Sequence, residues 1–419
     1  MDINNEHSVI NATQTLTPND KEKDMPYFQS PKVIFGKGAF KKLILELQGK
    51  GDRIALITDP IMKPKCTELA EGLTAAGYAV FVWDEVEADP TLDLALEASR
   101  FLLNCTPQWV IGFGGGSAID TAKAAWVLYE RPDLASGDLT RSILPKARLD
   151  LRKKARFVAI PTTSGTGADV TWVAVLADRA RNRKIVFAHN DIVPDISVLD
   201  TGVTLGMPKE VTASTGLDVI AHAVDGYTSR QQNDFSDGLC LQAAHMAMEW
   251  LPVVCRDGSN FQAREKMQNA ATIAGLGFGN SNTALSHALG HSAGAVFHLS
   301  HGRAIGIALP YSLSYIATHP AIEGTPDPVE RLTTLSRFVG IEAPSSKEAA
   351  EAFIDRIRAI QKEIGEPLSL KEAGITEDRM QKELDTLVQI AEKDPNMYTT
   401  PCECKGEALR TLFEEMWRG

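Results

Sequence analysis

Short apolar runs alternate with longer helical stretches along the first half of the chain. The apolar runs are rich in β-branched and aromatic residues, as strands are, and they occupy residues 32–35, 53–58, 79–83, 109–113 and 157–160. Between them, residues 65–76, 92–103 and 117–129 have the length and apolar spacing of helices. This alternation predicts an α/β domain whose mostly parallel sheet is covered by helices on both faces. A hairpin is also expected, from residues 171–177 and 184–188.

The pattern changes near residue 205. Beyond Pro208, long segments rich in Ala, Leu, Met and Glu replace the β-branched runs. Proline suits the first turn of a helix, so we expect one to begin at Pro208 and to continue through Asp218 and His222. The chain is therefore predicted to have three units: a disordered extension at 1–25, an α/β domain at 26–204 and an all-helical domain at 205–419.

Composition and charge exclude several classes of partner. Apolar residues make up 44% of the chain and charged residues 23%, as in globular proteins. The formal charge of −11 argues against a nucleic-acid or anionic membrane surface, since both require clustered Lys and Arg. No apolar run is long enough to span a bilayer, and the N-terminal segment lacks the apolar core of a secretory signal. Six scattered cysteines are too few for a disulfide framework, so we expect a cytoplasmic protein.

A glycine-rich turn follows the strand expected at 109–113. Gly114, Gly115, Gly116 and Ser117 lie between that strand and a helix that contains Asp120. Without Cβ atoms, backbone N–H groups can approach a phosphate closely, and the helix N-terminus adds unpaired donors and a positive dipole end. A pyrophosphate would fit this turn. A tight strand-to-helix turn without a ligand is the alternative for a single glycine triplet.

Two further features favour a dinucleotide. Pro-Thr-Thr-Ser-Gly-Thr-Gly at 161–167 follows the next strand, and ligands of open α/β sheets bind at the carboxyl ends of strands. Asp59 follows the strand at 53–58, where a carboxylate would accept hydrogen bonds from a ribose diol. The same charge would repel the 2′-phosphate of NADP, so it favours NAD. A helix cap is the alternative role for Asp59.

Aspartate and histidine recur at helical spacing in the second half. Asp218 and His222 are four residues apart in an apolar segment, and His287 and His291 repeat that spacing. Residues four apart share one helix face, so their side chains can converge on one ion. His301 follows at the expected start of another helix. One carboxylate with several imidazoles suits Fe²⁺ or Zn²⁺, which would polarise an alcohol or carbonyl oxygen beside a nicotinamide.

Together these motifs resemble the iron-containing (group III) alcohol dehydrogenases, which have a dehydroquinate synthase-like fold. The resemblance rests on Gly-Gly-Gly-Ser-Ala-Ile-Asp-Thr-Ala-Lys at 114–123, the threonine-rich loop at 161–167, Gly-Leu-Asp-Val-Ile-Ala-His-Ala at 216–223 and the histidines that follow. It covers the chain from about Tyr27 to the end. It implies an NAD-dependent oxidoreductase that interconverts a small alcohol and its aldehyde or ketone, and that forms a homodimer or larger homo-oligomer.

The resemblance also assigns residues. It implies that the metal ligands are Asp218, His222, His287 and His301. His291 would be the non-ligand histidine beside the nicotinamide, where it could pass the alcohol proton outward or only pack in the cleft wall. The cofactor residues would be Asp59, Gly115, Gly116, Ser117, Asp120, Thr162, Thr163, Thr166 and Lys184, and the substrate pocket would include Trp172, Val173 and Phe278.

One departure and three alternatives stay open at this point. The family often carries Asn-Pro-Arg near the C-terminus, where this chain has Thr400-Pro401-Cys402, a difference that bears on the substrate and not on the metal ligands. A glycerol-dehydrogenase-like zinc enzyme would use fewer ligands. A dehydroquinate-synthase-like lyase would place several Lys and Arg around the metal. A non-catalytic metal or nucleotide-binding module would not need metal ligands and cofactor loops together.

Overall fold

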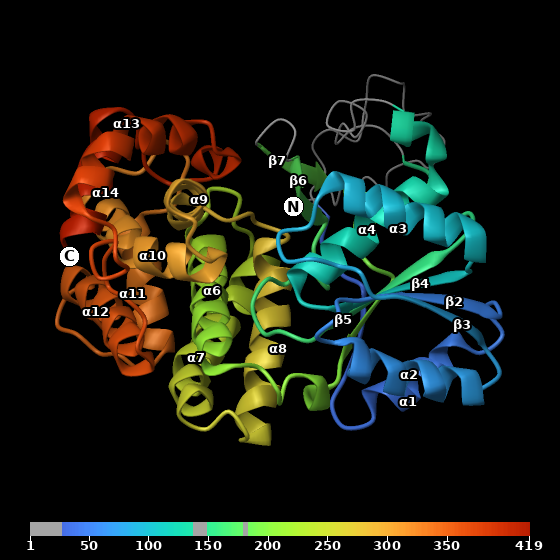
Figure 1. The fold of residues 1–419 in the computed structure, drawn as a ribbon. Coiled ribbons are helices and arrows are strands. Elements are labelled where there is room, and N and C mark those ends of the chain that lie inside the picture. The colour runs from blue at the N-terminus through green and yellow to red at the C-terminus, as the bar shows by residue number, and fades with distance from the viewer. Residues whose placement is uncertain (1–26, 137–148, 179–182) are drawn as a thin grey trace, which may run out of the picture.

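The computed structural model describes residues 27–136, 149–178 and 183–419. The extension predicted at 1–25 and most of the connection between the two hairpin strands lie outside these ranges. Within them an α/β half lies beside a helical half (Figure 1), as the sequence predicts. None of the described helices is both long and apolar enough to cross a membrane.

Six parallel strands form one sheet, in the order β1-β8-β5-β4-β2-β3. They are β1 Lys32–Phe35, β2 Arg53–Ile57, β3 Ala79–Trp83, β4 Trp109–Gly114, β5 Arg156–Pro161 and β8 Ile196–Leu199. β4 and β8 are buried along their whole length, as expected for a parallel sheet covered on both faces. The five predicted strands are confirmed, with bounds that shift by at most one residue. β8 was not predicted, since its four residues are too few to show a period.

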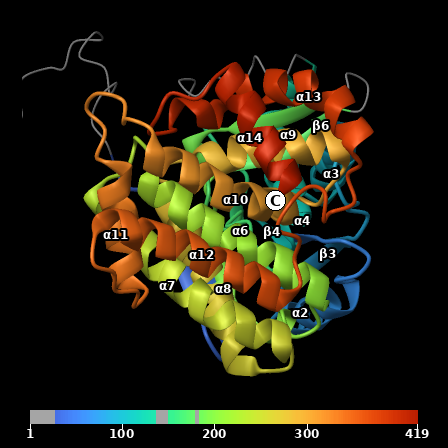
Figure 2. The same cartoon turned by 90° about the vertical axis from the view of Figure 1, so that its left-hand side faces the viewer.

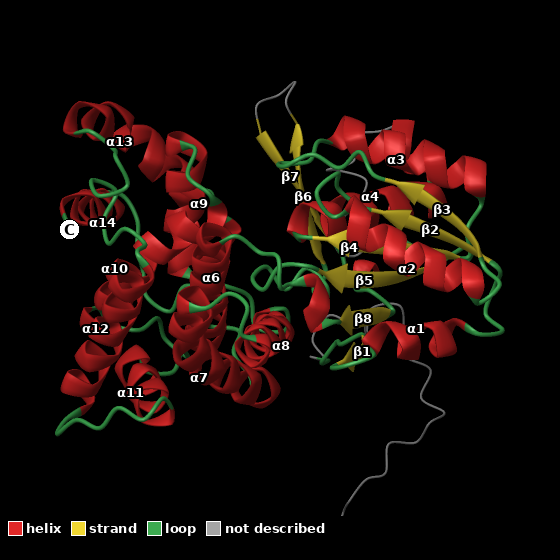
Figure 3. Cartoon of the chain, turned by 60° about the horizontal axis from the view of Figure 1, so that its bottom comes forward, coloured by secondary structure: helices red, strands yellow, loops and turns green. Residues whose placement is uncertain are grey.

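Helices cover both faces of this sheet (Figure 3). They are α1 Ala39–Leu47, α2 Lys63–Ala75, α3 Leu92–Cys105 and α4 Gly116–Glu130. Leu43 of α1 and Leu73 of α2 belong to one apolar cluster, and Leu102 of α3 and Trp126 of α4 belong to the cluster on the opposite face. The antiparallel pair β6 Val173–Asp178 and β7 Arg183–Ala188 stands apart from the sheet, as the predicted hairpin. Short 3-10 turns are η1 Pro132–Ser136, η3 Asn190–Ile192 and η4 Thr201–Val203.

The second half is helical, as predicted. It comprises α6 Lys209–Thr228, α7 Asp234–Arg256, α8 Phe261–Phe278, α9 Leu285–Phe297, α10 His301–Thr318, α11 Pro328–Phe338, α12 Ser346–Ile364, α13 Glu377–Glu392, η5 Pro395–Tyr398 and α14 Glu407–Arg418. α6 is buried almost without interruption and packs against α7, α8 and α10 (Figure 2). A helix that is apolar on all sides belongs in a core, and α6 is the central helix of this half.

The two halves have separate apolar cores. The clusters around the sheet contain no residue beyond Val203, and the cluster of the helical half begins at Ala213. The boundary predicted between residues 204 and 205 therefore falls between β8 and α6. α8 lies at the junction of the halves (Figure 1) and contacts both.

Candidate metal centre and cofactor loops

Asp218, His222, His287 and His301 converge, although they come from three helices. Each offers a ligand atom, and these atoms lie within 4.8 Å of one another. Asp218 Oδ1 is 3.4 Å from Nε2 of His301, 3.8 Å from Nε2 of His222 and 3.9 Å from Nε2 of His287. Asp218 and His222 share one face of α6, while His287 is in the first turn of α9 and His301 begins α10. The structure thus brings the four predicted ligands together.

The chemistry of these atoms fits a divalent cation. Asp218 Oδ1 and His287 Nε2 are buried and have no hydrogen-bond partner within the described ranges. Leaving such atoms unsatisfied costs free energy, and a cation among them would remove that cost. Burial lowers the pKa of His222 to about 3, so its imidazole stays neutral and keeps a lone pair for a metal. Burial raises the pKa of the Asp218 carboxyl, but the three surrounding histidines together lower it below its ordinary value, so the carboxyl stays ionised. Three imidazoles and one carboxylate are a set suited to Fe²⁺ or Zn²⁺.

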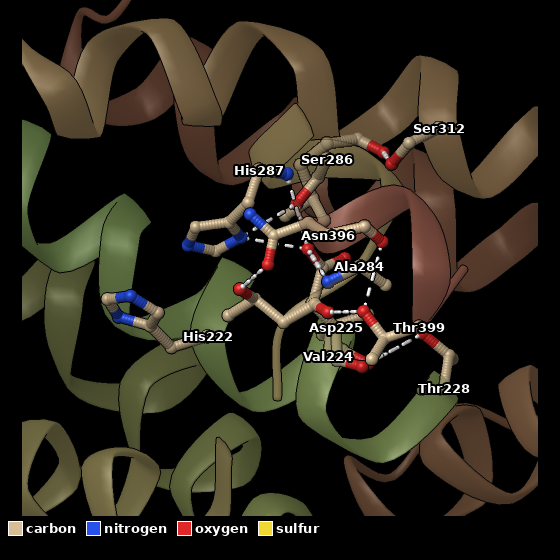
Figure 4. Close-up of polar contacts among 12 residues, drawn as sticks. His222, Val224, Asp225, Thr228, Ala284, Ser286, His287, Ser312, Asn396 and Thr399 are labelled. Carbon is tan, nitrogen blue, oxygen red and sulfur yellow. Dashed lines mark hydrogen bonds and ion pairs between the residues drawn. The ribbon is translucent and has the colours of Figure 1, made fainter. Parts of the chain in front are cut away.

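Asp225 orients one of these ligands. Its Oδ2 is 2.8 Å from His287 Nδ1, so the Nε2 of that ring is directed toward Asp218. The same oxygen accepts from Ser286 Oγ at 2.6 Å and from the Ala284 N–H at 3.0 Å (Figure 4). A carboxylate that holds a ligating imidazole is a common outer shell of metal sites. Sequence reasoning missed Asp225, although its position seven residues after Asp218 places both on one face of α6.

His291 lies beside the four convergent residues but is not one of them. Its ring centroid is 5.2 Å from that of His301 and 5.8 Å from that of His287. Its side chain is 39% exposed, whereas that of His287 is 3% exposed. Its Nδ1 is 2.8 Å from Oδ2 of Asp394, a residue just before η5 that the sequence did not suggest.

The two predicted cofactor loops lie side by side because β4 and β5 are neighbours. Gly114 pairs with Pro161, and the N–H of Thr162 donates to the Gly114 carbonyl at 3.0 Å. A Cβ at Gly116 would lie 2.9 Å from Thr166 Cγ2, so a side chain there would collide with the facing loop. Gly115 is the N-cap residue of α4, and it has no side chain that could accept from the first N–H groups of the helix. These backbone N–H groups therefore stay available as donors at the helix N-terminus. An anion would be well placed there.

Gly115 faces Thr163 across the same gap. A Cβ at Gly115 would lie 3.4 Å from Thr163 Cγ2. Ser117, in the first turn of α4, accepts a hydrogen bond on its carbonyl from Thr121 at 2.8 Å. The threonine loop and the glycine loop therefore face each other across a short distance.

The two carboxylate oxygens of Asp59 have different surroundings. Its Oδ1 accepts from the N–H of Met62 at 2.9 Å, which is the capping alternative. Its Oδ2 lies 3.0 Å from the position of a Cβ on Gly114, beside the glycine loop. The role of that second oxygen in binding a ribose stays a prediction.

Two polar residues of α4 turn toward the hairpin. Asp120 Oδ2 accepts from the N–H of Val175 at 2.9 Å, and burial raises its pKa to about 6. Lys123 is fully buried and donates to the carbonyls of Thr171 and Val173 at 2.6 and 3.0 Å. Asp120 thus has a structural partner, and its role in cofactor binding stays a prediction. Lys184 is in β7 opposite Ala177, and its side chain lies outside the described part of the structure.

α8 connects the threonine loop to the metal centre. Thr272 donates to the buried carboxylate of Asp169 at 3.0 Å, two residues past the loop. One turn later, a Cβ at Gly275 would lie 2.9 Å from the Gly167 Cα, so the helix and the loop are in backbone contact. Such close approach requires glycine on both sides.

The predicted pocket residues gather where α8 ends. The Phe278 ring stacks on His222, with centroids 4.1 Å apart and planes 14° apart. Trp172 donates its indole N–H to the carbonyl of Gly279 at 2.6 Å, and Val173 follows it at the start of β6. Phe278 therefore contacts a predicted metal ligand, and Trp172, from the α/β half, contacts the end of the same helix.

Comparison with known proteins finds matches to both halves of the chain. Residues 30–201 match the profile described as iron-containing alcohol dehydrogenase, and residues 212–417 match the C-terminal part of the Fe-containing alcohol dehydrogenase family. The chain is 31% identical over 388 residues to an NADPH-dependent butanol dehydrogenase of Clostridium saccharobutylicum, covering 92% of this chain and 96% of that protein. It is 33% identical over 353 residues to an aldehyde-alcohol dehydrogenase of Streptococcus pneumoniae. That alignment covers 82% of this chain but only 40% of the relative, so the chain spans less than half the length of that protein.

Solved structures show the same fold. An alcohol dehydrogenase from Oenococcus oeni superposes with a TM-score of 0.86 at 27% identity, covering 94% of this chain and 100% of the other. A sulfoacetaldehyde reductase from Bifidobacterium kashiwanohense, solved in complex with NAD⁺, gives a TM-score of 0.80 at 27% identity, with 94% and 99% covered. Both matched profiles and a relative aligned over nearly its full length lead to one conclusion. This chain belongs to the iron-containing alcohol dehydrogenase family.

Proposed function

We propose that this protein interconverts an alcohol and its aldehyde or ketone by hydride transfer to or from NAD, with Fe²⁺ or Zn²⁺ held by Asp218, His222, His287 and His301. The observation that carries the proposal is the convergence of these four side chains. The helix α8 connects them to the threonine loop, because Phe278 at its end stacks on His222 and Thr272 donates to Asp169 just past the loop. Relatives named as butanol and 1-propanol dehydrogenases support a small alcohol as substrate. No observation favours the lyase alternative.

The metal-binding residues and His291 would have separate roles in alcohol oxidation. Asp218, His222, His287 and His301 would hold the cation, which would supply Lewis-acid polarisation of the alcohol oxygen, and NAD would supply the hydride acceptor. His291, one turn from the ligand His287, takes the hydroxyl proton and passes it to solvent through its exposed side. Burial lowers the pKa of His291, and the hydrogen bond to Asp394 opposes this, so a neutral ring is ready to accept. The products are the carbonyl compound, NADH and one proton.

A substrate panel tests the function directly. Anaerobically purified protein is to be mixed with NADH or NADPH, with Fe²⁺ or Zn²⁺ and with a series of short aldehydes, and consumption of the reduced cofactor followed by absorbance. We expect turnover of at least one short aldehyde and a requirement for metal that a chelator abolishes. If NADH and NADPH are both left unconsumed with every aldehyde at saturating metal, the proposed reaction is wrong.

The cofactor preference gives a second test. We expect the wild type to prefer NADH, because Asp59 Oδ2 beside the glycine loop would bind a ribose diol and repel a 2′-phosphate. Asp59→Asn keeps an oxygen to cap Met62 but removes the charge, so the preference should narrow by about tenfold, the scale of one charge-assisted hydrogen bond. Asp59→Gly should also weaken NADH binding. The KM values for both cofactors decide the matter, and a wild type that favours NADPH would show that Asp59 is wrongly assigned.

We further propose a cytoplasmic homodimer or larger homo-oligomer. All six cysteines are buried thiols, which is consistent with a reducing compartment. β1 is an edge strand of the sheet and carries Phe35, which is 68% exposed in the single chain. An edge strand with an exposed aromatic side chain is a surface that a second copy can cover.

A further inference from the structure

Two histidines of α9 each have a carboxylate at Nδ1. His287 is paired with Asp225 and His291 with Asp394, both at 2.8 Å. The first pair orients a predicted metal ligand, as described above. The second pair orients a ring outside the ligand set, and Asp394 is only 10% exposed. A buried carboxylate directed at a proton-transfer residue points to a function beyond packing.

Each oxygen of Asp394 has its own donors. Oδ2 faces His291, while Oδ1 accepts from the backbone N–H of Asn396 at 2.9 Å and from its Nδ2 at 2.7 Å. Thr283 Oγ1 donates to Asn396 Oδ1 at 2.6 Å, and the backbone N–H of Asn396 is a donor in any orientation of its side-chain amide. The side of Asp394 that faces Asn396 must therefore be an acceptor of two N–H groups.

The tautomer of His291 follows from this arrangement. Burial raises the pKa of Asp394, but the hydrogen bond and charge of His291, together with the two N–H donors of Asn396, outweigh burial and leave the pKa below its ordinary value. An ionised carboxylate can only accept, so the proton of the neutral imidazole must be on Nδ1. The lone pair of the ring is then on Nε2, the nitrogen on the far side from Asp394.

We propose that Asp394 is a positioning residue that holds His291 as the Nδ1–H tautomer, so that Nε2 is the atom that takes the alcohol proton. This inference rests on the proposed alcohol dehydrogenase function. Without the carboxylate, the neutral ring would divide between two tautomers, and the form with its proton on Nε2 cannot accept another there.

Two variants separate this role from simple packing. In Asp394→Asn the amide oxygen must face the two N–H groups of Asn396, so the NH₂ group faces His291 Nδ1 and favours the Nε2–H tautomer. In Asp394→Ala the ring is free to adopt either form. The proposal therefore expects the near-isosteric Asn variant to be the more damaged of the two, with kcat lowered about 10²-fold. KM and bound metal should stay close to wild type. A packing role expects the reverse order, since Ala leaves a cavity.

The tautomer itself can be measured without turnover. Histidine-specific ¹⁵N NMR of the zinc-loaded holoenzyme, with His291→Gln to assign the signal, should show the ring proton on Nδ1 in the wild type and on Nε2 in Asp394→Asn. A wild-type ring with its proton on Nε2, or an Asn variant with higher kcat than the Ala variant, overturns the proposal. If no alcohol or aldehyde is turned over, the proposed function fails, and the NMR signals still decide whether Asp394 sets the tautomer.

Discussion

His287→Ala should remove the metal and abolish turnover. Its Nε2 is buried, lies 3.9 Å from Asp218 Oδ1 and has no hydrogen-bond partner within the described ranges, as a ligand atom awaiting a cation would. Loss of Lewis-acid stabilisation worth several kcal/mol lowers kcat by at least about 10³-fold, since each 1.4 kcal/mol is a factor of ten. Metal analysis after anaerobic purification should find about one ion per chain in the wild type and almost none in the variant.

A histidine elsewhere in the helical half provides the matched control. His245 is on α7 and its side chain is 43% exposed. It contacts Glu249 and Phe338, which do not belong to the ligand set. His245→Ala should keep both metal and activity. Metal-free wild type should regain activity when Fe²⁺ is added, whereas His287→Ala should not. Full turnover by the metal-free wild type or by metal-free His287→Ala would contradict the predicted metal site.

His291→Ala should lower kcat about 10²-fold and leave the metal in place. The ring is adjacent to His301 and His287 but outside the four convergent ligands, and its exposed side opens a path for the proton to solvent. A factor of this size is usual for a general acid or base. Steady-state kinetics and metal content, measured on the same preparation, give both values.

His298→Asn is the control for this variant. His298 ends α9, is exposed and has a φ of 58°, which asparagine tolerates. We expect it to behave as wild type. An unchanged kcat in His291→Ala would reject the proton relay, and loss of metal would show instead that His291 is a ligand.

Much of the fold could be predicted because it depends on local patterns. Fully buried parallel strands appear as short β-branched runs, and helices appear through their apolar period, so the alternation in the first half already indicated a parallel α/β sheet. The four-residue spacings of Asp218 with His222 and of His287 with His291 place each pair on one helix face in any helical structure. Glycines after β4 and hydroxyls after β5 likewise indicate a phosphate site wherever those strands are neighbours.

Tertiary structure alone decided how these local pieces meet. β8 has too few residues to show a period, yet its place between β1 and β5 completes the sheet. Asp394 is 103 residues from His291, and no spacing relates them, because their contact depends on how η5 packs against α9. In the same way, the stacking of Phe278 on His222 and the contact of Gly275 with Gly167 arise where α8 crosses between the halves. Local sequence sets which face of a helix or strand a side chain occupies, whereas the neighbours of that face are chosen by packing of the whole chain.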